Sequence, residues 1–391
     1  MASKIKVKIR SFGEDAMGAF KVAKQRLHNI LHASEKDIEE DPITEKARTL
    51  HRGLIKAKVT QIEKDGEHAS KITFSAPCPL YFSTGQYLTV SLKLGDKVAT
   101  RPYSITSSPA QGKEGIVSIL VKEKADEPFF SRYLNRDLKV GDELFLEVGL
   151  GDLTLNPIRD KAEILGVAGG VGIAPFLSMA KAINENESSP FRLTVLYGSR
   201  KQTDILASKE IASLESERVH FINVLSEEPD YPGEKGFITA SLIQEYCDVT
   251  KVSFFLCGPH VMEEFVLKEL STLGVDIRHV RSECPASLPL PKTDAKTYLL
   301  KVHRGIELLE LKAREDEPLI IALERAGIYV HSCCRSGKCG ACRVEVINGE
   351  FEENENDARR FYDVAYRYAY SCHAYPRSDM EIRIPIESFP A

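Results

Sequence analysis

Short segments of alternating hydrophobic and polar residues mark the chain between residues 54 and 158. The clearest are residues 55–60, 71–74, 87–92 and 117–121, which Gly, Pro and Asp residues separate. A period of two residues is typical of strands with one buried face, and several short strands in a row indicate an all-β domain. We therefore predict an antiparallel β-barrel domain over residues 54–158.

Beyond residue 159 the pattern changes to apolar, strand-like runs that alternate with helical ones. The predicted strands are residues 162–167, 192–197, 219–225, 252–256 and 276–280. Such alternation predicts a parallel sheet with helices on both faces, an α/β domain that we place at residues 159–284.

Two further regions flank these domains. Three prolines within residues 284–292 predict a semi-rigid linker, placed at residues 285–296, before a third domain at residues 297–391. Residues 1–53 form an N-terminal helical extension, in which an alternating segment at residues 5–9 precedes a helix with one apolar face. That face either packs on the chain's own body or serves as a docking arm for a partner.

Composition narrows the classes of partner. The 391 residues are 43% hydrophobic and 28% charged, which is ordinary for proteins that bury sizeable cores. With 52 Lys and Arg against 57 Asp and Glu, the net charge of −5 gives no electrostatic reason to expect nucleic acid as a partner. Small molecules and other proteins are the expected partners.

Two long stretches of the chain, residues 72–92 and 164–180, lack charged side chains. Both are interrupted by Gly and Pro residues, so neither predicts a membrane span. The first residues lack the apolar core of a secretion signal. We therefore expect a cytoplasmic protein.

The cysteines carry the strongest chemical signal. Cys334, Cys339 and Cys342 have the spacing C-x4-C-x2-C, and Cys372 follows later in the chain. Four thiolates with this plant-type spacing are the ligands of a [2Fe-2S] cluster. A zinc site is the alternative, but zinc sites typically use paired C-x2-C knuckles and only one such pair occurs here. Cys333 is out of register, and we expect it to be a packed or exposed thiol.

A second motif, Arg101-Pro102-Tyr103-Ser104, follows a predicted strand. An arginine can bind a phosphate through two hydrogen bonds, a tyrosine can stack on a flat ring, and a serine hydroxyl can donate to a ring nitrogen. Four residues alone are a weak signal, but this chemistry suits a flavin nucleotide.

A third motif is the glycine-rich turn with Gly169, Gly170 and Gly172, which joins an apolar strand to a helix. Glycines let a phosphate-bearing ligand approach the backbone, and a helix N-terminus favours anions. The turn is not the Gly-x-Gly-x-x-Gly string, so taken alone it also fits a plain tight turn.

Taken in order, these features resemble the ferredoxin-NADP⁺ reductase superfamily, and within it single-chain NADH-dependent flavin reductases with a C-terminal plant-type [2Fe-2S] ferredoxin domain. The resemblance covers residues 54–388 and includes the segments at residues 196–200 and 256–260. It implies a multidomain protein with a flavin-binding antiparallel β-barrel, a nucleotide-binding α/β domain and a ferredoxin domain of the α+β β-grasp fold.

The resemblance also implies roles for the residues at the flavin. Arg101 is expected to hold the flavin phosphate, with Pro102 beside it, Tyr103 stacked on the isoalloxazine and Ser104 near its N5 atom. Ser131 is expected beneath the pyrophosphate of FAD. Bulky residues occupy the neighbouring positions 129 and 130, where the family usually has small ones, so FMN stays possible.

The resemblance also implies which residues contact the pyridine nucleotide, and these lie at the ends of three predicted strands. The expected residues are Gly169, Gly170, Gly172, Tyr197, Cys257, Gly258 and Pro259. Glu227, Glu228 and Asp230 favour NADH, since carboxylates repel a 2′-phosphate, although Arg200 and Lys201 lie nearby in the sequence.

The resemblance implies an NADH:acceptor oxidoreductase. A hydride passes from NADH to the flavin, with Ser104 tuning N5 and Cys257 lining the pocket, and single electrons then pass through the cluster to a partner redox protein, such as an oxygenase or hydroxylase component. Other acceptors stay open: a hybrid-cluster or other anaerobic redox protein, or a diffusible quinone or ferric ion. A different class, a metal-stabilised binding or sensing module, is a further alternative.

Overall fold

The computed structural model describes residues 12–31, 46, 53–95, 97–123, 128–283, 293–353 and 358–385. The chain divides into two compact units, Met1–Arg52 and Gly53–Ala391. In the first unit the described element is helix α1 (Phe12–Leu31), which confirms a helix in the extension. The alternating segment at residues 5–9 and most of the predicted linker lie outside the described residues. Within the described part of the chain, no helix is long and apolar enough to span a membrane.

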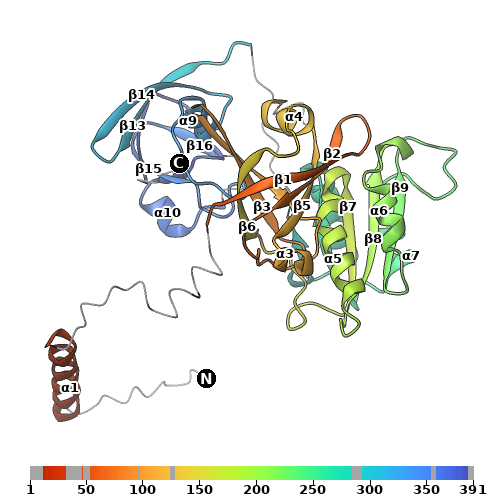
Figure 1. Ribbon diagram of the computed structural model, residues 1–391, viewed down its shortest axis with the longest axis horizontal. Helices are drawn as coiled ribbons and strands as arrows, with labels where there is room; N and C mark the ends of the chain where they lie inside the picture. Colours follow the sequence, from red (N-terminus) through yellow and green to blue (C-terminus); the bar gives the residue numbers. More distant parts are fainter. Residues whose placement is uncertain are drawn as a thin grey trace. The chain divides into compact units, whose positions relative to one another are not determined.

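The second unit begins with the predicted barrel, which is confirmed (Figure 1). Its strands are β1 (Ile55–Lys64), β2 (Ala69–Ser75), β3 (Tyr87–Leu94), β4 (Lys97–Ser104), β5 (Ile116–Lys122) and β6 (Glu143–Leu150). They pair antiparallel in the order β4-β3-β6-β1-β2-β5, and a bridge between Ile105 and Ile119 joins the two ends of this order. Alternate residues such as Leu88, Val90 and Phe74 fill the interior, and helices α3 (Pro109–Lys113) and α4 (Pro128–Arg136) complete the domain.

The nucleotide domain is a six-stranded parallel sheet, as its alternating pattern predicts. Its strands are β7 (Glu163–Gly169), β8 (Arg192–Ser199), β9 (Val219–Leu225), β10 (Glu234–Lys235), β11 (Val252–Cys257) and β12 (Val280–Ser282), in the order β10-β9-β8-β7-β11-β12. Helices α5 (Ala174–Glu185) and α6 (Ser208–Leu214) pack on one face with Ile164. Helices α7 (Ala240–Tyr246) and α8 (His260–Thr272) pack on the other face with Leu165.

One strand of this domain starts later than predicted. Residues 277–279 form a 3₁₀ turn instead of a strand, and β12 begins only at Val280. The reason is local, because the Asp276 side chain accepts a hydrogen bond from the backbone N–H of Arg278 at 2.9 Å. An aspartate that caps a turn in this way competes with extended backbone.

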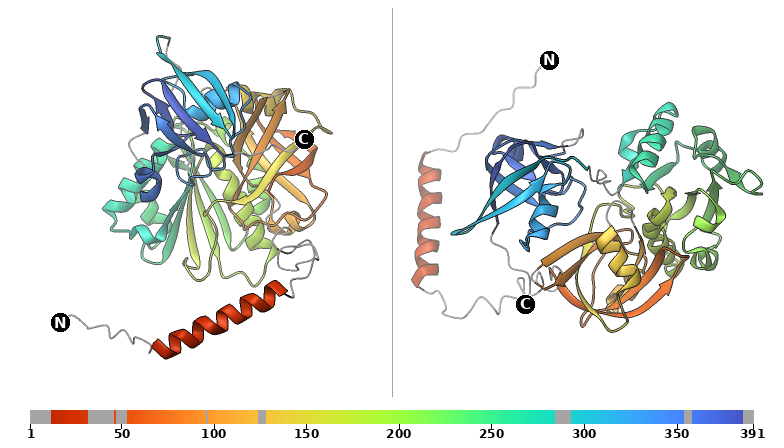
Figure 2. Two further views of the ribbon diagram at one scale, coloured as in Figure 1. Left: turned by 90° about the vertical axis from the view of Figure 1, so that its left-hand side faces the viewer. Right: turned by 90° about the horizontal axis from the view of Figure 1, so that it is seen from above.

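The ferredoxin domain has the β-grasp arrangement that the resemblance implies. Its main sheet contains β13 (Thr297–Arg304), β14 (Glu307–Arg314), β15 (Arg343–Asn348), β17 (Tyr368–Tyr370) and β19 (Met380–Ile384), in the order β14-β13-β19-β15-β17. The first and last strands, β13 and β19, pair in parallel at its centre. Helix α9 (Leu319–Arg325) covers the sheet, and β16 (Phe351–Glu353), β18 (Ala374–Pro376) and α10 (Phe361–Ala365) complete the domain. Figures 1 and 2 show this domain, in blue, beside the orange strands of the barrel.

Candidate functional site

The four predicted cluster ligands lie together in the ferredoxin domain. Cys334, Cys339 and Cys342 lie in the loop between α9 and β15, and Cys372 lies in the turn between β17 and β18. Within this loop, the backbone N–H groups of Ser336 and Cys339 donate to the Cys334 sulfur, each at 3.4 Å. Backbone donors of this kind stabilise thiolate ligands and tune a metal centre. The loop residues are therefore arranged to hold anionic sulfur.

The cysteines form two pairs. Cys334 is hydrogen-bonded to Cys339, and Cys342 to Cys372, and these bonds together with burial raise the pKa of Cys334 and of Cys372. A tetrahedral zinc ion with bonds of about 2.3 Å would place all four sulfurs about 3.8 Å apart. Among the described residues, no three of the four sulfurs lie within 4.8 Å of one another. The donor set fits two irons with one thiol pair each, which is a [2Fe-2S] cluster.

Arg101 lies at the centre of β4 and contacts the ferredoxin domain. One guanidinium nitrogen donates to both carboxylate oxygens of Glu324, on α9, at 3.0 and 3.1 Å. The guanidinium also lies over the ring of Phe130, 5.4 Å from its centroid. Arg335, next to the ligand Cys334, binds the same carboxylate. The residue predicted to hold the flavin phosphate is thus also linked, through Glu324, to the cluster loop.

One of the bulky residues at positions 129 and 130 packs against predicted flavin residues, and the other faces solvent. The side chain of Phe130 is fully buried in the barrel core and stacks on Tyr103, with ring centroids 6.3 Å apart and an interplanar angle of 27°. Phe129 is exposed. Ser131 is buried on α4, directly after these two residues. Phe130 thus contacts Tyr103 and Arg101, two of the residues predicted to bind the flavin.

Two residues between the predicted flavin and cluster sites carry no signal in the sequence: Tyr87, which is buried, and Glu283, which is half-buried. Tyr87 pairs with Ser104 across β3 and β4, and burial, followed by the thiols of Cys334 and Cys339, raises its pKa. Glu283 follows β12, and burial raises the pKa of its carboxyl to about 8, with further contributions from neighbouring anionic groups. Tyr87 was hidden in a regular strand pattern, and Glu283 had no motif around it.

The predicted nucleotide-binding residues meet where two neighbouring strands end. The glycine-rich turn follows β7, and Cys257, Gly258 and Pro259 follow or end β11, the adjacent strand. The chain runs outward in opposite directions from β7 and β11, and ligands of such sheets bind in the crevice at this point. A Cβ atom at Gly172 would overlap the carbonyl of Cys257, so only glycine lets the two loops approach this closely.

Tyr197 stabilises the glycine-rich turn through its hydroxyl group. Its side chain is fully buried, and its hydroxyl donates to the carbonyl of Gly170 at 3.0 Å and accepts from the backbone N–H of Leu206 at 3.1 Å. Burial raises the pKa of Tyr197 to about 12, so the hydroxyl remains a donor at neutral pH. The structure therefore brings Tyr197 to the turn itself.

The loop after β9 carries Glu227, Glu228 and Asp230, the carboxylates that the sequence analysis expects to repel a 2′-phosphate. The loops after β8 and β9 are joined by a hydrogen bond from the backbone of Gln202 to Glu228 at 3.1 Å. Glu227 lies 4.0 Å from Arg200, so the charge of this arginine is already paired with a carboxylate. This charge pattern favours NADH over NADPH.

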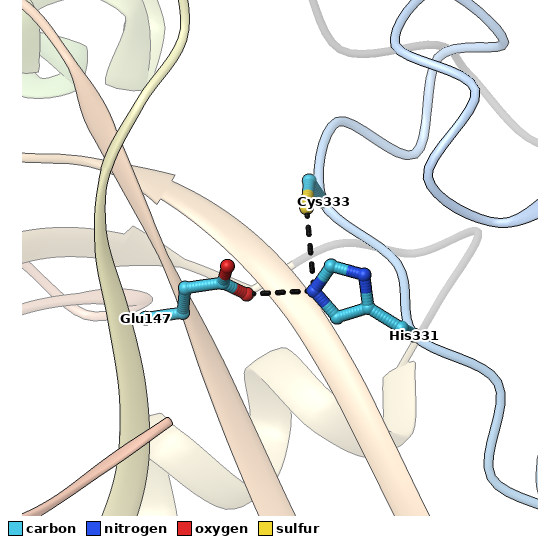
Figure 3. A group of neighbouring side chains, drawn as sticks. All are labelled: Glu147, His331 and Cys333. Atoms are coloured by element: carbon cyan, nitrogen blue, oxygen red, sulfur yellow. Dashed lines mark hydrogen bonds and ion pairs between the residues drawn. The ribbon is translucent and has the colours of Figure 1, made fainter. Parts of the chain in front are cut away.

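A second contact joins the cluster loop to the barrel. His331 Nε2 lies 2.8 Å from Glu147 Oε2, on strand β6, and 3.7 Å from the sulfur of Cys333 (Figure 3). Glu147 and His331 belong to different domains, so this contact and the ion pair between Arg101 and Glu324 fasten the cluster loop against the barrel strands.

Three protein-family models match the chain in the order of these domains. They describe an oxidoreductase FAD-binding domain at residues 56–154, an oxidoreductase NAD-binding domain at residues 167–268 and a 2Fe-2S iron-sulfur cluster binding domain at residues 306–377. FAD, NADH and a [2Fe-2S] cluster, the cofactors predicted from the sequence, are confirmed by these matches together with the relatives that follow.

Two curated relatives match most of their own length. NADH oxidoreductase HCR of Escherichia coli (strain K12) is 28% identical, over 79% of this chain and 91% of the relative. The heme-dependent oxidative N-demethylase beta subunit of Ectopseudomonas mendocina (strain ymp) is 30% identical, over 70% of this chain and 81% of the relative. Among solved structures, phthalate dioxygenase reductase has a TM-score of 0.63 at 21% identity and covers 85% of this chain and 98% of its own, which shows a shared fold.

Proposed function

This chain belongs to the ferredoxin-NADP⁺ reductase superfamily as a single-chain, NADH-dependent iron–sulfur flavoprotein reductase, and from that premise we propose that its electron acceptor is an oxygenase or hydroxylase component. The relative named as a subunit of an oxidative N-demethylase supports this acceptor. Because four thiolate ligands suit a reducing compartment, we also propose a cytoplasmic location.

Bound FAD would supply the two-electron chemistry that accepts a hydride from NADH, and a [2Fe-2S] cluster would supply the one-electron chemistry toward the acceptor. The chain's own part is to bind and orient these groups. We assign Arg101 to the FAD phosphate, with Pro102 and Tyr103 forming a flat face for the isoalloxazine ring and Ser104 offering a hydroxyl near N5. Ser131, at the start of α4, supplies a polar group for the pyrophosphate.

The nucleotide is assigned to the crevice between the ends of β7 and β11. Gly169 and Gly170 leave the backbone accessible to its phosphates, and Cys257, Gly258 and Pro259 form the wall on the nicotinamide side. The four cysteines hold the cluster. No side chain is assigned a role as acid, base or nucleophile, because hydride and electron transfer require none.

The contact between the cluster loop and the barrel carries this proposal. His331 and Glu147 are 2.8 Å apart, although one belongs to the ferredoxin domain and the other to the predicted flavin domain. A metal-stabilised binding module would need the cysteines but would have no reason to fasten them against a flavin site. A reductase needs this proximity, since electrons must cross between the two groups.

Anaerobic titration with NADH tests the proposal. We expect bleaching of the flavin and cluster absorbance together with the EPR signal of a reduced [2Fe-2S] centre. Cys342→Ser should abolish reduction of an oxygenase component or of cytochrome c while sparing NADH-to-dye reduction, and Cys247→Ser, a cysteine on the end of α7, should change neither. Protein that is iron-free, or that stays oxidised under excess NADH, would contradict the proposal.

A further inference from the structure

Three side chains that the cluster does not use converge beside it. Glu147 Oε2, His331 Nε2 and Cys333 Sγ all lie within 4.8 Å of one another. Figure 3 shows that the carboxylate and the thiol both point at the same ring nitrogen. Glu147 comes from barrel strand β6, whereas His331 and Cys333 come from the segment that leads into the cluster loop. Oxygen, nitrogen and sulfur donors thus meet at one point between two domains.

The ring nitrogen of His331 cannot form good hydrogen bonds to both Glu147 and Cys333 at the same time. A single ring nitrogen carries either one proton or one lone pair. If Nε2 is protonated, it donates to Glu147 at 2.8 Å. The Cys333 thiol, 3.7 Å away, then cannot donate to this nitrogen and keeps only its hydrogen bond with Cys339. If Nε2 is unprotonated, it can accept from Cys333, but its lone pair then faces the carboxylate. A metal cation, by contrast, can bind the carboxylate oxygen, the ring nitrogen and the thiolate sulfur at the same time.

We propose that Glu147, His331 and Cys333 bind a zinc ion, with water as the fourth ligand. Zinc takes carboxylate oxygen and imidazole nitrogen at about 2.0–2.2 Å and thiolate sulfur at about 2.3 Å, so that tetrahedral donors lie roughly 3.3–3.8 Å apart. The distances of 2.8 and 3.7 Å from Nε2 need only small side-chain shifts to reach that range. Calcium and magnesium prefer oxygen ligands alone, so the mixed donor set disfavours both and suits zinc, which binds carboxylate, imidazole and thiolate.

The charges and burial of the site suit this ion. A carboxylate and a thiolate together neutralise Zn²⁺, and binding releases the thiol proton to solvent. Cys333 is buried, whereas Glu147 and His331 are half-buried, which leaves a path for water and for metal entry. The ion would join β6 to the residue next to the cluster ligand Cys334, and so hold the cluster loop on the barrel.

Metal analysis of the holoprotein tests the site without any activity measurement. Protein loaded with FAD and iron, exposed to equimolar zinc and desalted, should contain about one zinc and about two irons per chain. Glu147→Gln, His331→Gln and Cys333→Ser should each lose the zinc and retain flavin and iron. Retained flavin and iron show that a variant has folded.

Each variant has a matched control. Glu143→Gln changes another carboxylate of β6, one paired with Lys56, and Cys78→Ser changes a cysteine of the barrel. His303→Gln changes a histidine that pairs with a carboxylate, Glu381, at 2.5 Å but has no third donor in the described structure. All three controls should keep the zinc.

Three outcomes would overturn the site. Wild-type protein without bound zinc would leave the three residues as a hydrogen-bonded group only. Zinc that persists in Glu147→Gln would belong to the cluster cysteines, and its amount would then rise as iron falls. Loss of iron in Cys333→Ser, with zinc unchanged, would make Cys333 a cluster residue. Equilibrium dialysis of chelator-treated wild-type protein against zinc gives the stoichiometry independently of the variants.

Discussion

Glu283 is a half-buried carboxyl among groups that disfavour its charge. Burial raises its pKa to about 8, the neighbouring Asp152 and Cys334 add to this, and Lys338 opposes it. One carboxyl oxygen has no hydrogen-bond partner among the described residues. Its backbone N–H donates to the carbonyl of Leu256 at 3.0 Å, which extends the pairing of β12 with β11 and fixes the position of Glu283 at the end of the sheet. We therefore expect Glu283 to be neutral in the folded protein at neutral pH.

This environment predicts a pH-dependent stability. The folded pKa of about 8 lies above the ordinary value of 4.5, so between these values the folded protein holds a proton that the unfolded chain has lost. The stability from this group is complete below pH 4.5 and is lost as the pH rises toward 8. Glu283→Gln is neutral at every pH and does not lose this stability. The unfolding temperature of the variant minus that of the wild type should therefore increase as the pH rises.

Thermal unfolding of the holoprotein at several pH values between about 5 and 8 measures this difference. Glu187→Gln, which changes an exposed carboxylate, is the control and should follow the wild type throughout. A Glu283→Gln curve parallel to the wild-type curve would show that the carboxyl is not held neutral.

Individual residues of the site differ in how far the sequence predicts them. The four cysteines and Arg101 stand in short motifs whose spacing reports their chemistry. Tyr87 and Glu283 lie beside them only because β3 pairs with β4 and β12 pairs with β11. Pairing of this kind depends on packing across the fold, which the local pattern around either residue does not contain.

At the scale of elements, the alternation of strands and helices predicts how the strands are arranged as well as where they lie in the sequence. It predicts a parallel sheet whose strand ends share one edge, and this brings the loops after β7 and β11 together. The sequence does not show how closely they approach. That follows from Gly172, where a Cβ atom would overlap the backbone carbonyl of Cys257.

We expect Gly172→Ala to separate these loops. The added atom meets backbone that cannot rotate away, so stability should fall by about 1–3 kcal/mol, as for other overpacked sites. The concentration of NADH needed for half-maximal flavin reduction should rise, because the proposed nucleotide crevice is distorted. Stopped-flow reduction and thermal unfolding measure the two effects.

Gly198→Ala is the matched control at the same sheet edge. Its Cβ atom would lie 3.6 Å from its nearest neighbours, an ordinary contact. The change should therefore alter stability by no more than about 0.5 kcal/mol. Gly172→Ala protein with wild-type NADH dependence would mean that the approach of the two loops does not shape the crevice.

At the scale of the molecule, polar side chains tie the barrel to both neighbouring domains. Lys71 and Lys181 both bind Glu210, and Lys181 also donates to the carbonyl of Thr106 at 2.7 Å, which joins the barrel to the nucleotide domain. The pair formed by Arg101 and Glu324 joins it to the ferredoxin domain. The three domains follow from sequence patterns, but these contacts do not, because Arg101 and Glu324 are 223 residues apart.

Substitution of Glu324 should slow electron transfer to the cluster without weakening flavin binding. Its carboxylate is largely buried, and it accepts from Arg101, from Arg335 and from the backbone N–H of Thr100 at 3.2 Å. Glu324→Gln weakens the hold of the ferredoxin domain on the barrel. In anaerobic stopped-flow traces we expect unchanged flavin reduction by NADH but cluster reduction about tenfold slower, equivalent to about 1.4 kcal/mol in activation free energy.

The same substitution should act in the opposite direction on the flavin. With Glu324 neutral, the charge of Arg101 is no longer shared, so the apoprotein should bind FAD more tightly, while riboflavin, which has no phosphate, should bind as before. Glu317→Gln, which breaks an ion pair with Arg325 inside the ferredoxin domain, should leave flavin affinity and cluster reduction unchanged. Equally tighter binding of FAD and riboflavin would remove Arg101 from the phosphate site. Weaker binding of both would mark Glu324 as a purely structural residue of the ferredoxin domain, at its contact with the barrel.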